Sequence, residues 1–141
     1  MRNANLVKKL MASQFNSKHG TVAKSPAELY MAFADMRAFK QMIPPDKQES
    51  VQADYDSISV TVQGFNIGVR VLERVPYSRI TLCDSNAPFR FNICFSFDPL
   101  PDGKTDFHID VEAELNMMMK MMLGSKIKDG LDKIVEQFSN V

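Results

Sequence analysis

Two stretches near the end of the chain alternate apolar and polar residues with hardly a break, and this alternation constrains the fold most strongly. Successive side chains of a strand point to opposite faces, so a period of two predicts antiparallel strands with one dry face and one wet face. The segment from Pro99 to Gly103 supplies the hairpin turn between the two strands. Their apolar positions are Phe89, Phe91, Ile93, Phe95 and Phe97, then Phe107, Ile109, Val111, Ala113 and Leu115.

Shorter runs with the same alternation fall between residues 51 and 85, and Phe15 to Lys24 suits a first strand. Six or seven such strands curl as they twist, and their phenylalanine-rich dry face must be covered. The only long helical pattern, from Asn116 to Asn140, has a suitable apolar stripe in its second half. We therefore predict an α+β fold in which a curved antiparallel sheet wraps a long C-terminal helix. The stripe comprises Leu123, Ile127, Leu131, Ile134, Val135 and Phe138.

The first half of this helix is unusual because its methionines point all round the cylinder. Methionine is unbranched and polarizable, and it serves where a surface must adapt to more than one shape. The run can fill an irregular end of the core or line the mouth of a cavity. Lys120 lies on the apolar stripe, where it can meet an anionic head group or extend to solvent. The methionines are Met117, Met118, Met119, Met121 and Met122.

Two short helices are predicted between the first strand and the rest of the sheet. Ser25 to Glu28 combines an N-cap serine, a proline at the first helical position and a glutamate that closes a capping box. Asp35 can cap a second short helix, which Pro44 and Pro45 end. In an unbroken first strand His19 faces the apolar side, unless Gly20 introduces a bulge and exchanges the faces.

Charge and composition narrow the class of protein. The chain has 17 basic and 17 acidic residues among 141 and no basic stripe interleaved with aromatics, which argues against a nucleic-acid partner. The N-terminus has no apolar segment of the length that a signal peptide or membrane span requires, so we expect a cytoplasmic protein without stable membrane insertion. Residues 1–12 are predicted to be a flexible lead and residues 13–141 a single domain. Cys83 and Cys94 are offset in register, which favours reduced thiols.

This order of elements resembles the START-related helix-grip superfamily, also described as SRPBCC or polyketide cyclase-like, and in particular its small uncharacterised bacterial members. The segments that carry the resemblance are SPAELYMAFADMRAF, ERVPYSRITL and AELNMMMKMM, and the similarity extends over nearly the whole chain from about Phe15. The resemblance implies a cavity between sheet and helix that holds an apolar or amphipathic small molecule. Branches of the superfamily include enzymes, carriers and proteins that bind other proteins, so the fold does not select among these roles.

Motifs for catalysis are sparse. The chain has no G-x-S-x-G elbow, no C-x-x-C and no glycine-rich loop before a helix. His19 is the one weak catalytic candidate. His108 and Asp110 share a strand face and could begin a metal site, but no third ligand has suitable spacing, so we predict a solvated charge ladder, no metal and no cofactor.

We favour a binding module for an apolar or amphipathic molecule of lipid, polyketide or aromatic type over catalysis. A cyclase or aromatase-like enzyme that uses the same cavity, with His19 as acid or base, is the first alternative. The second alternative is a protein-interaction module that docks through the methionine-rich end of the C-terminal helix. Its partner is another protein or a second copy of the chain, which would give a homodimer. The predicted cavity residues are Phe91, Phe95, Phe107, Ile109, Val111, Met117, Lys120, Met121 and Gly124.

Overall fold

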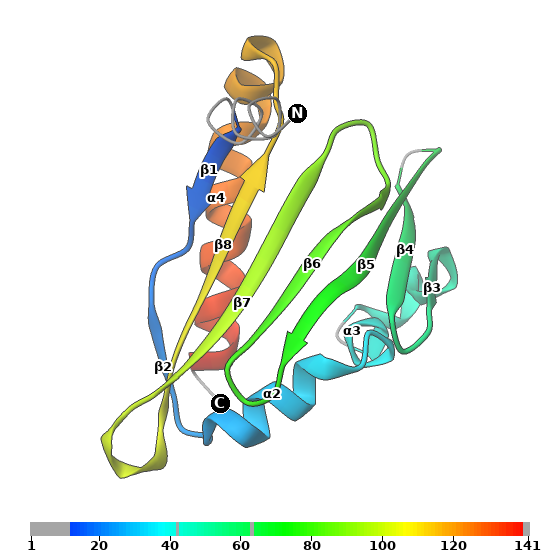
Figure 1. Cartoon of the computed structure of the whole chain (residues 1–141). Helices are drawn as coiled ribbons and strands as arrows, with labels where there is room; N and C mark the ends of the chain where they lie inside the picture. Colours follow the sequence, from blue (N-terminus) through cyan, green and yellow to red (C-terminus); the bar gives the residue numbers. More distant parts are fainter. Residues whose placement is uncertain (1–11, 42, 63, 140–141) are drawn as a thin grey trace, which may run out of the picture.

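The computed structural model describes residues 12–41, 43–62 and 64–139. An antiparallel sheet of eight strands curves beside a long C-terminal helix, as the alternation predicts (Figure 1). The predicted flexible lead lies almost wholly outside the described residues. The elements are β1 (Ser13–Asn16), β2 (Gly20–Val22), α2 (Pro26–Ala34), α3 (Arg37–Gln41), η1 (Pro45–Ser50), β3 (Val51–Ala53), β4 (Ser57–Val62), β5 (Phe65–Val75), β6 (Arg79–Asn86), β7 (Phe91–Pro99), η2 (Pro101–Gly103), β8 (Thr105–Ala113) and α4 (Met117–Ser139).

The strand order is β1-β8-β7-β6-β5-β4-β3, and β2 also pairs with β8. The predicted hairpin is confirmed, with Phe95 opposite Ile109 and Phe97 opposite Phe107. These four side chains are buried and form the centre of the core. The sheet has eight strands instead of six or seven because the predicted first strand is divided into β1 and β2. Both cysteines are free, as expected.

A bulge separates β1 from β2. Asn16 lies opposite Asp110 and Gly20 opposite Phe107, so four steps along the first strand match three along β8. The Ser17 amide donates to the Ile109 carbonyl at 2.8 Å, and the Ile109 amide donates to the Ser17 hydroxyl at 2.8 Å. After this extra residue the alternation of the side chains is reversed, so a position that would have faced the core faces outward. His19 therefore lies on the outer face, and its placement by an unbroken alternation is wrong. The faces are exchanged, as the alternative allowed, but by a bulge between Asn16 and Gly20 and not at Gly20 itself.

The two short helices form where the capping signals predict them. The Ser25 hydroxyl accepts a hydrogen bond from the Glu28 amide at 3.2 Å, and Pro26 begins α2. Asp35 has extended backbone angles that end α2, and its carboxylate accepts from the Arg37 amide at 2.9 Å at the start of α3. The two helices thus form a bent arm across one end of the sheet (Figure 1).

Helix α4 packs mainly against β1, β2 and β8, while α2 packs against β6 and β7 (Figure 1). Leu131 and Val135 on the predicted stripe are buried. At the other end of α4, Met117 and Met121 are each 80% exposed. The helix therefore covers one side of the concave face, and α2 covers the neighbouring strands β6 and β7.

Gly20 lies where the last turns of α4 meet β2. A β-carbon at this position would stand 2.1 Å from the Ser139 hydroxyl oxygen and 2.6 Å from a methyl group of the fully buried Val135. Real β-carbons do not approach that closely, so the glycine permits the close contact between helix and strand.

We predict that Gly20→Ala lowers the free energy of unfolding by about 1–3 kcal/mol, because the added methyl group overpacks this contact. Gly130→Ala is the matched control, since no atom lies within 4 Å of the β-carbon built there. Alanine in an exposed helix interior should raise stability by up to about 1 kcal/mol. Urea denaturation of both variants measures the two effects, and equal stabilities for the two variants would contradict this account of the packing.

Candidate functional site

An apolar cavity of about 320 Å³ lies between the arm, the concave face of the sheet and the C-terminal half of α4. Gln137 supplies the single polar side chain among the described lining residues. We call this space the arm cavity. Its lining residues are Phe33, Met36, Phe39, Ile43, Ile58, Val69, Leu82, Ile93, Phe95, Ile134, Gln137 and Phe138.

The floor of the arm cavity follows from the register of the sheet. Ile58 lies opposite Val69, and Leu82 lies opposite Ile93, so their side chains share the concave face. The pairing of β5 with β6 shifts twice, between Gly68 and Val69 and between Val71 and Glu73. Such irregularities increase the local twist and bend a strand. The apolar side chains of β4 to β7 therefore line a hollow between the arm and α4.

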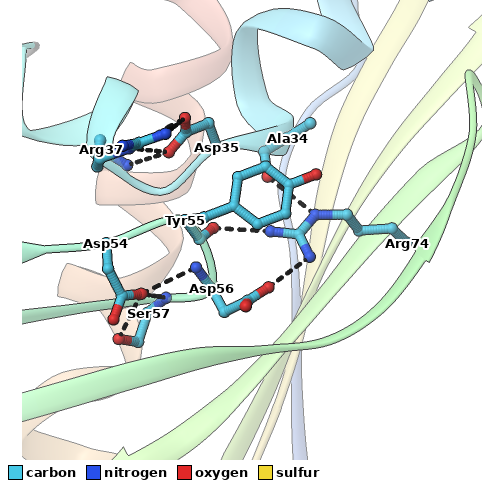
Figure 2. A network of polar contacts seen from close by, with 8 residues as sticks. All are labelled: Ala34, Asp35, Arg37, Asp54, Tyr55, Asp56, Ser57 and Arg74. Atoms are coloured by element: carbon cyan, nitrogen blue, oxygen red, sulfur yellow. Dashed lines mark hydrogen bonds and ion pairs between the residues drawn. The ribbon is translucent and has the colours of Figure 1, made fainter.

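Arg74 fastens the arm to the sheet (Figure 2). Its Nε donates to the carbonyl of Ala34 at 2.9 Å, and its Nη2 donates to the carbonyl of Tyr55 at 2.7 Å. Its Nη1 lies 2.7 Å from a carboxylate oxygen of Asp56, and the guanidinium carbon stands 4.0 Å from the centroid of the Tyr55 ring. Ala34 is the last residue of α2, where carbonyls lack helical partners and a cation is favoured.

Two carboxylates order the backbone beside this contact. Hydrogen bonds from the Ser57 hydroxyl and from the amides of Asp56 and Ser57 lower the pKa of Asp54 below its usual 3.8. The Arg37 side chain and amide lower the pKa of Asp35 in the same way (Figure 2). Both carboxylates therefore stabilise the fold above the usual pKa, and this contribution is lost as the pH falls through the lowered values.

We predict that Arg74→Met lowers the free energy of unfolding by about 2–4 kcal/mol, because two carbonyls lose a charged donor in a largely covered place. The Met36 amide, which donates to the Tyr55 carbonyl at 3.2 Å, should also exchange its hydrogen faster. Arg79→Met is the control, since Arg79 pairs with Glu73 on the surface and should contribute under about 1 kcal/mol. Hydrogen exchange and urea denaturation measure both effects. An equal loss in the two variants would show that Arg74 does not fasten the arm.

The predicted cavity residues on the sheet divide between the arm cavity and the rest of the molecule. Phe95 lines the arm cavity. Phe107 and Ile109 are fully buried core residues, and Val111 is 7% exposed. Phe91 borders a different hollow, on the outer side of the sheet, which also includes Arg70, Arg90, Glu112 and Glu114.

The predicted cavity residues on α4 lie away from the arm cavity. Met117 and Met121 are largely exposed, and so is Lys120. Gly124 is half-buried, with its β-carbon position 3.6 Å from the ring of Phe15. The arm cavity lies toward the opposite end of the helix, beside Ile134 and Phe138.

Sequence reasoning missed most of the cavity lining because it assigned the apolar stripe of α4 to the core and named no cavity residue on the arm. Phe33 and Met36 lie on the arm, and both are fully buried while also lining the cavity. Ile134 and Phe138 belong to the predicted stripe of α4 and also line the cavity, although Ile134 is 37% exposed. The predicted arm could have indicated the cavity, because two short helices joined at a bend do not cover a sheet evenly and leave space beneath them.

His19 lies on the outer face, and its side chain is 60% exposed. Its Nδ1 stands 2.9 Å from Asp106 Oδ1, and its ring stacks on that of His108 with centroids 4.2 Å apart. The spacing along the sequence did not indicate that His19 lies beside His108, and the bulge places it there. Asp110, the expected companion of His108, hydrogen-bonds to Asn16 at 2.5 Å.

Among the described residues, no helix combines the length and the apolar character needed to span a bilayer.

Comparison with known proteins gives a fold-level relationship. No protein-family model and no curated protein sequence matches the chain. Among solved structures it is similar to Mll3558 from Rhizobium loti (15% identity, 92% of this chain and 96% of that chain, TM-score 0.68). It is also similar to a START superfamily protein from Mycobacterium smegmatis (18% identity, 88% of this chain and 97% of that chain, TM-score 0.57). A third similar structure is norcoclaurine synthase from Thalictrum flavum (10% identity, 96% of this chain and 90% of that chain, TM-score 0.65).

These similarities agree with the element order, the curved sheet and the long C-terminal helix. The chain therefore shares the helix-grip fold with these proteins.

Proposed function

We propose that the protein binds an apolar small molecule in the arm cavity. The observation that carries this proposal is a cavity of about 320 Å³ whose described lining has one polar side chain, Gln137. Small-molecule sites are commonly clefts of about 300–1,000 Å³ lined by apolar and aromatic side chains with a few polar groups. Burial of the ligand's apolar surface would contribute roughly 25 cal/mol per Å², before the entropic cost of association.

The size of the arm cavity indicates a small ligand. A closed apolar cavity of about 150 Å³ accepts benzene, so about twice that volume suits a molecule of two fused rings or a short acyl chain. The side-chain amide of Gln137 offers an NH2 group as donor and a carbonyl oxygen as acceptor for a polar group on such a molecule. The ligand class is therefore a compact aromatic or a short lipid with at most one polar end.

The cyclase-like alternative finds less support. General acid–base catalysis needs a titratable group within reach of the reacting atoms. None of the described residues that line the arm cavity is titratable, and His19 lies on the other face of the sheet. The relationship to norcoclaurine synthase is one of fold, which does not carry a reaction to this chain. Binding without catalysis is the function that these residues favour.

We predict that the wild-type chain binds prodan, a neutral naphthalene dye whose emission shifts to the blue in apolar surroundings. Val69→Phe should weaken this binding at least about tenfold, or 1.4 kcal/mol, because the ring occupies space on the cavity floor. Leu72→Phe adds a ring of similar bulk three residues along the same strand, at an exposed position outside the cavity lining, and should leave the affinity unchanged. A fluorescence titration gives the three affinities. No saturable binding to the wild type, or equal losses in both variants, would contradict the proposal.

A second candidate function rests on the exposed methionines at the start of α4. Four of them, Met117, Met118, Met121 and Met122, are 63–80% exposed, and we call them the methionine surface. An apolar, adaptable surface of this kind suits contact with another chain. Most oligomers of soluble proteins are symmetric, so a second copy that packs its own methionine surface against the first is the occupant we propose.

We predict that the wild type forms dimers at high concentration and that the double variant Met117→Gln, Met121→Gln does not. The loss follows from the removal of apolar surface from both sides of a two-fold contact. Met31→Gln is the control, because Met31 is 64% exposed but belongs to α2. Sedimentation equilibrium measures the masses. A monomeric wild type at the highest soluble concentration, or a dimer that survives in the double variant, would refute this candidate.

A further inference from the structure

The outer face of the sheet carries a cluster of two histidines and an aspartate, on the opposite side from the arm cavity. His19, Asp106 and His108 each offer one donor atom, and these atoms all lie within 4.8 Å of one another. We propose that this triad, the His–Asp cluster, binds a divalent transition-metal ion such as Zn²⁺. The site is independent of the proposed cavity function, since the core residue Phe107 lies between Asp106 and His108 and points inward.

The backbone assembles the cluster from two strands. Asp106 and His108 are two residues apart on β8 and therefore share its outer face. β2 pairs with this part of β8, with Thr21 opposite Asp106 and Gly20 opposite Phe107. The extra residue in the bulge then turns His19 outward, where it stacks on His108. A regular first strand would have placed His19 on the apolar side, so the bulge creates the third ligand.

One ring nitrogen of His108 lies near a carboxylate, and the other is buried without a partner. Its Nε2 lies 3.3 Å from Asp110 Oδ2, and its Nδ1 is buried without a hydrogen-bond partner. The Asp98 carboxylate, at 3.9 Å from Nδ1, is too far to satisfy it. Histidines that bind metals commonly give their other ring nitrogen to a carboxylate, which orients the ring and leaves one lone pair for the ion. An unpaired buried nitrogen is otherwise unfavourable, and a bound cation would satisfy it.

The remaining ligands can close on an ion with small movements. His19 Nδ1 already lies 2.9 Å and 3.2 Å from the two carboxylate oxygens of Asp106. Ligands at about 2.0–2.2 Å from a tetrahedral ion stand about 3.4 Å apart, so no pair needs to approach by more than roughly 1.4 Å. The exposed His19 ring has the freedom to do so.

The ligand types select the class of ion. Two imidazole nitrogens and one carboxylate suit Zn²⁺, Co²⁺ or Ni²⁺ better than Mg²⁺ or Ca²⁺, which prefer sets made of oxygen atoms. The neighbouring carboxylates of Asp98 and Asp110 add negative charge that favours a cation. Three protein ligands also leave a fourth position of a tetrahedral site open to water.

The test uses the full chain without an affinity tag, after treatment with a chelator. His19 and His108 are the only two histidines in the chain, so ¹⁵N spectra of the ring nitrogens report on both without ambiguity. Addition of Zn²⁺ should shift the ring resonances of both histidines in one saturable step. This measurement on the wild type does not depend on the folding of any variant.

Calorimetric titration with Zn²⁺ then compares two variants of the same strand. Asp106→Asn should weaken binding at least about tenfold, because it removes a ligand. Glu112→Gln removes a charge from the same face, where Glu112 accepts a hydrogen bond from Gln14, and should bind as the wild type does. The proposal is overturned if Zn²⁺ shifts neither or only one histidine. It is also overturned if both variants lose affinity equally, since that result means diffuse attraction to an acidic face.

Discussion

The ring of Phe33 holds the arm, the sheet and the terminal helix together. It is fully buried, and its centroid lies 4.8 Å from the ring centroid of Phe138 on α4. The ring centroids of Phe95 and Phe107 on the sheet are each 5.3 Å away. Aromatic pairs at these separations contribute beyond the area that they bury. Because the arm is anchored at this point, it covers the middle strands, and α4 is left to cover β1, β2 and β8. The arm cavity is the space that these two coverings do not fill.

The alternation of β8 places apolar side chains on one face of the sheet and polar or charged side chains on the other. Phe107 and Ile109 face the core, while Asp106, His108 and Asp110 face outward between them. The inner side provides an apolar space without titratable groups among its described residues. The outer side gathers the only two histidines of the chain around carboxylates. The two faces of β8 therefore differ in chemistry, with apolar side chains on the inner face and imidazoles and carboxylates on the outer face.

Most of the fold could be predicted from the sequence, because it follows from local periodicity. The alternation from Phe89 to Leu115 and the capping signals at Ser25 and Asp35 each act within a few residues. The position of the cavity could not be predicted, since it depends on how far α4 moves aside for the arm. The position of α4 depends on the contacts of Phe33, which join residues up to about 100 positions apart in the sequence. The histidine cluster was missed because a period of two does not locate a bulge. The sequence suggested one at Gly20, but the extra residue lies between Asn16 and Gly20 and brings His19 beside His108.

The central claim is that an apolar ligand enters the space beneath the arm and not the methionine-rich end of α4. Methionine methyl groups test it directly, because Met36 lines the arm cavity while Met117 and Met121 lie exposed at the far end. In a chain labelled with ¹³C at the methionine methyls, a small neutral aromatic compound should shift the Met36 resonance and show transfer of magnetisation to it. Shifts confined to the methionines of α4, with Met36 unchanged, would contradict the account.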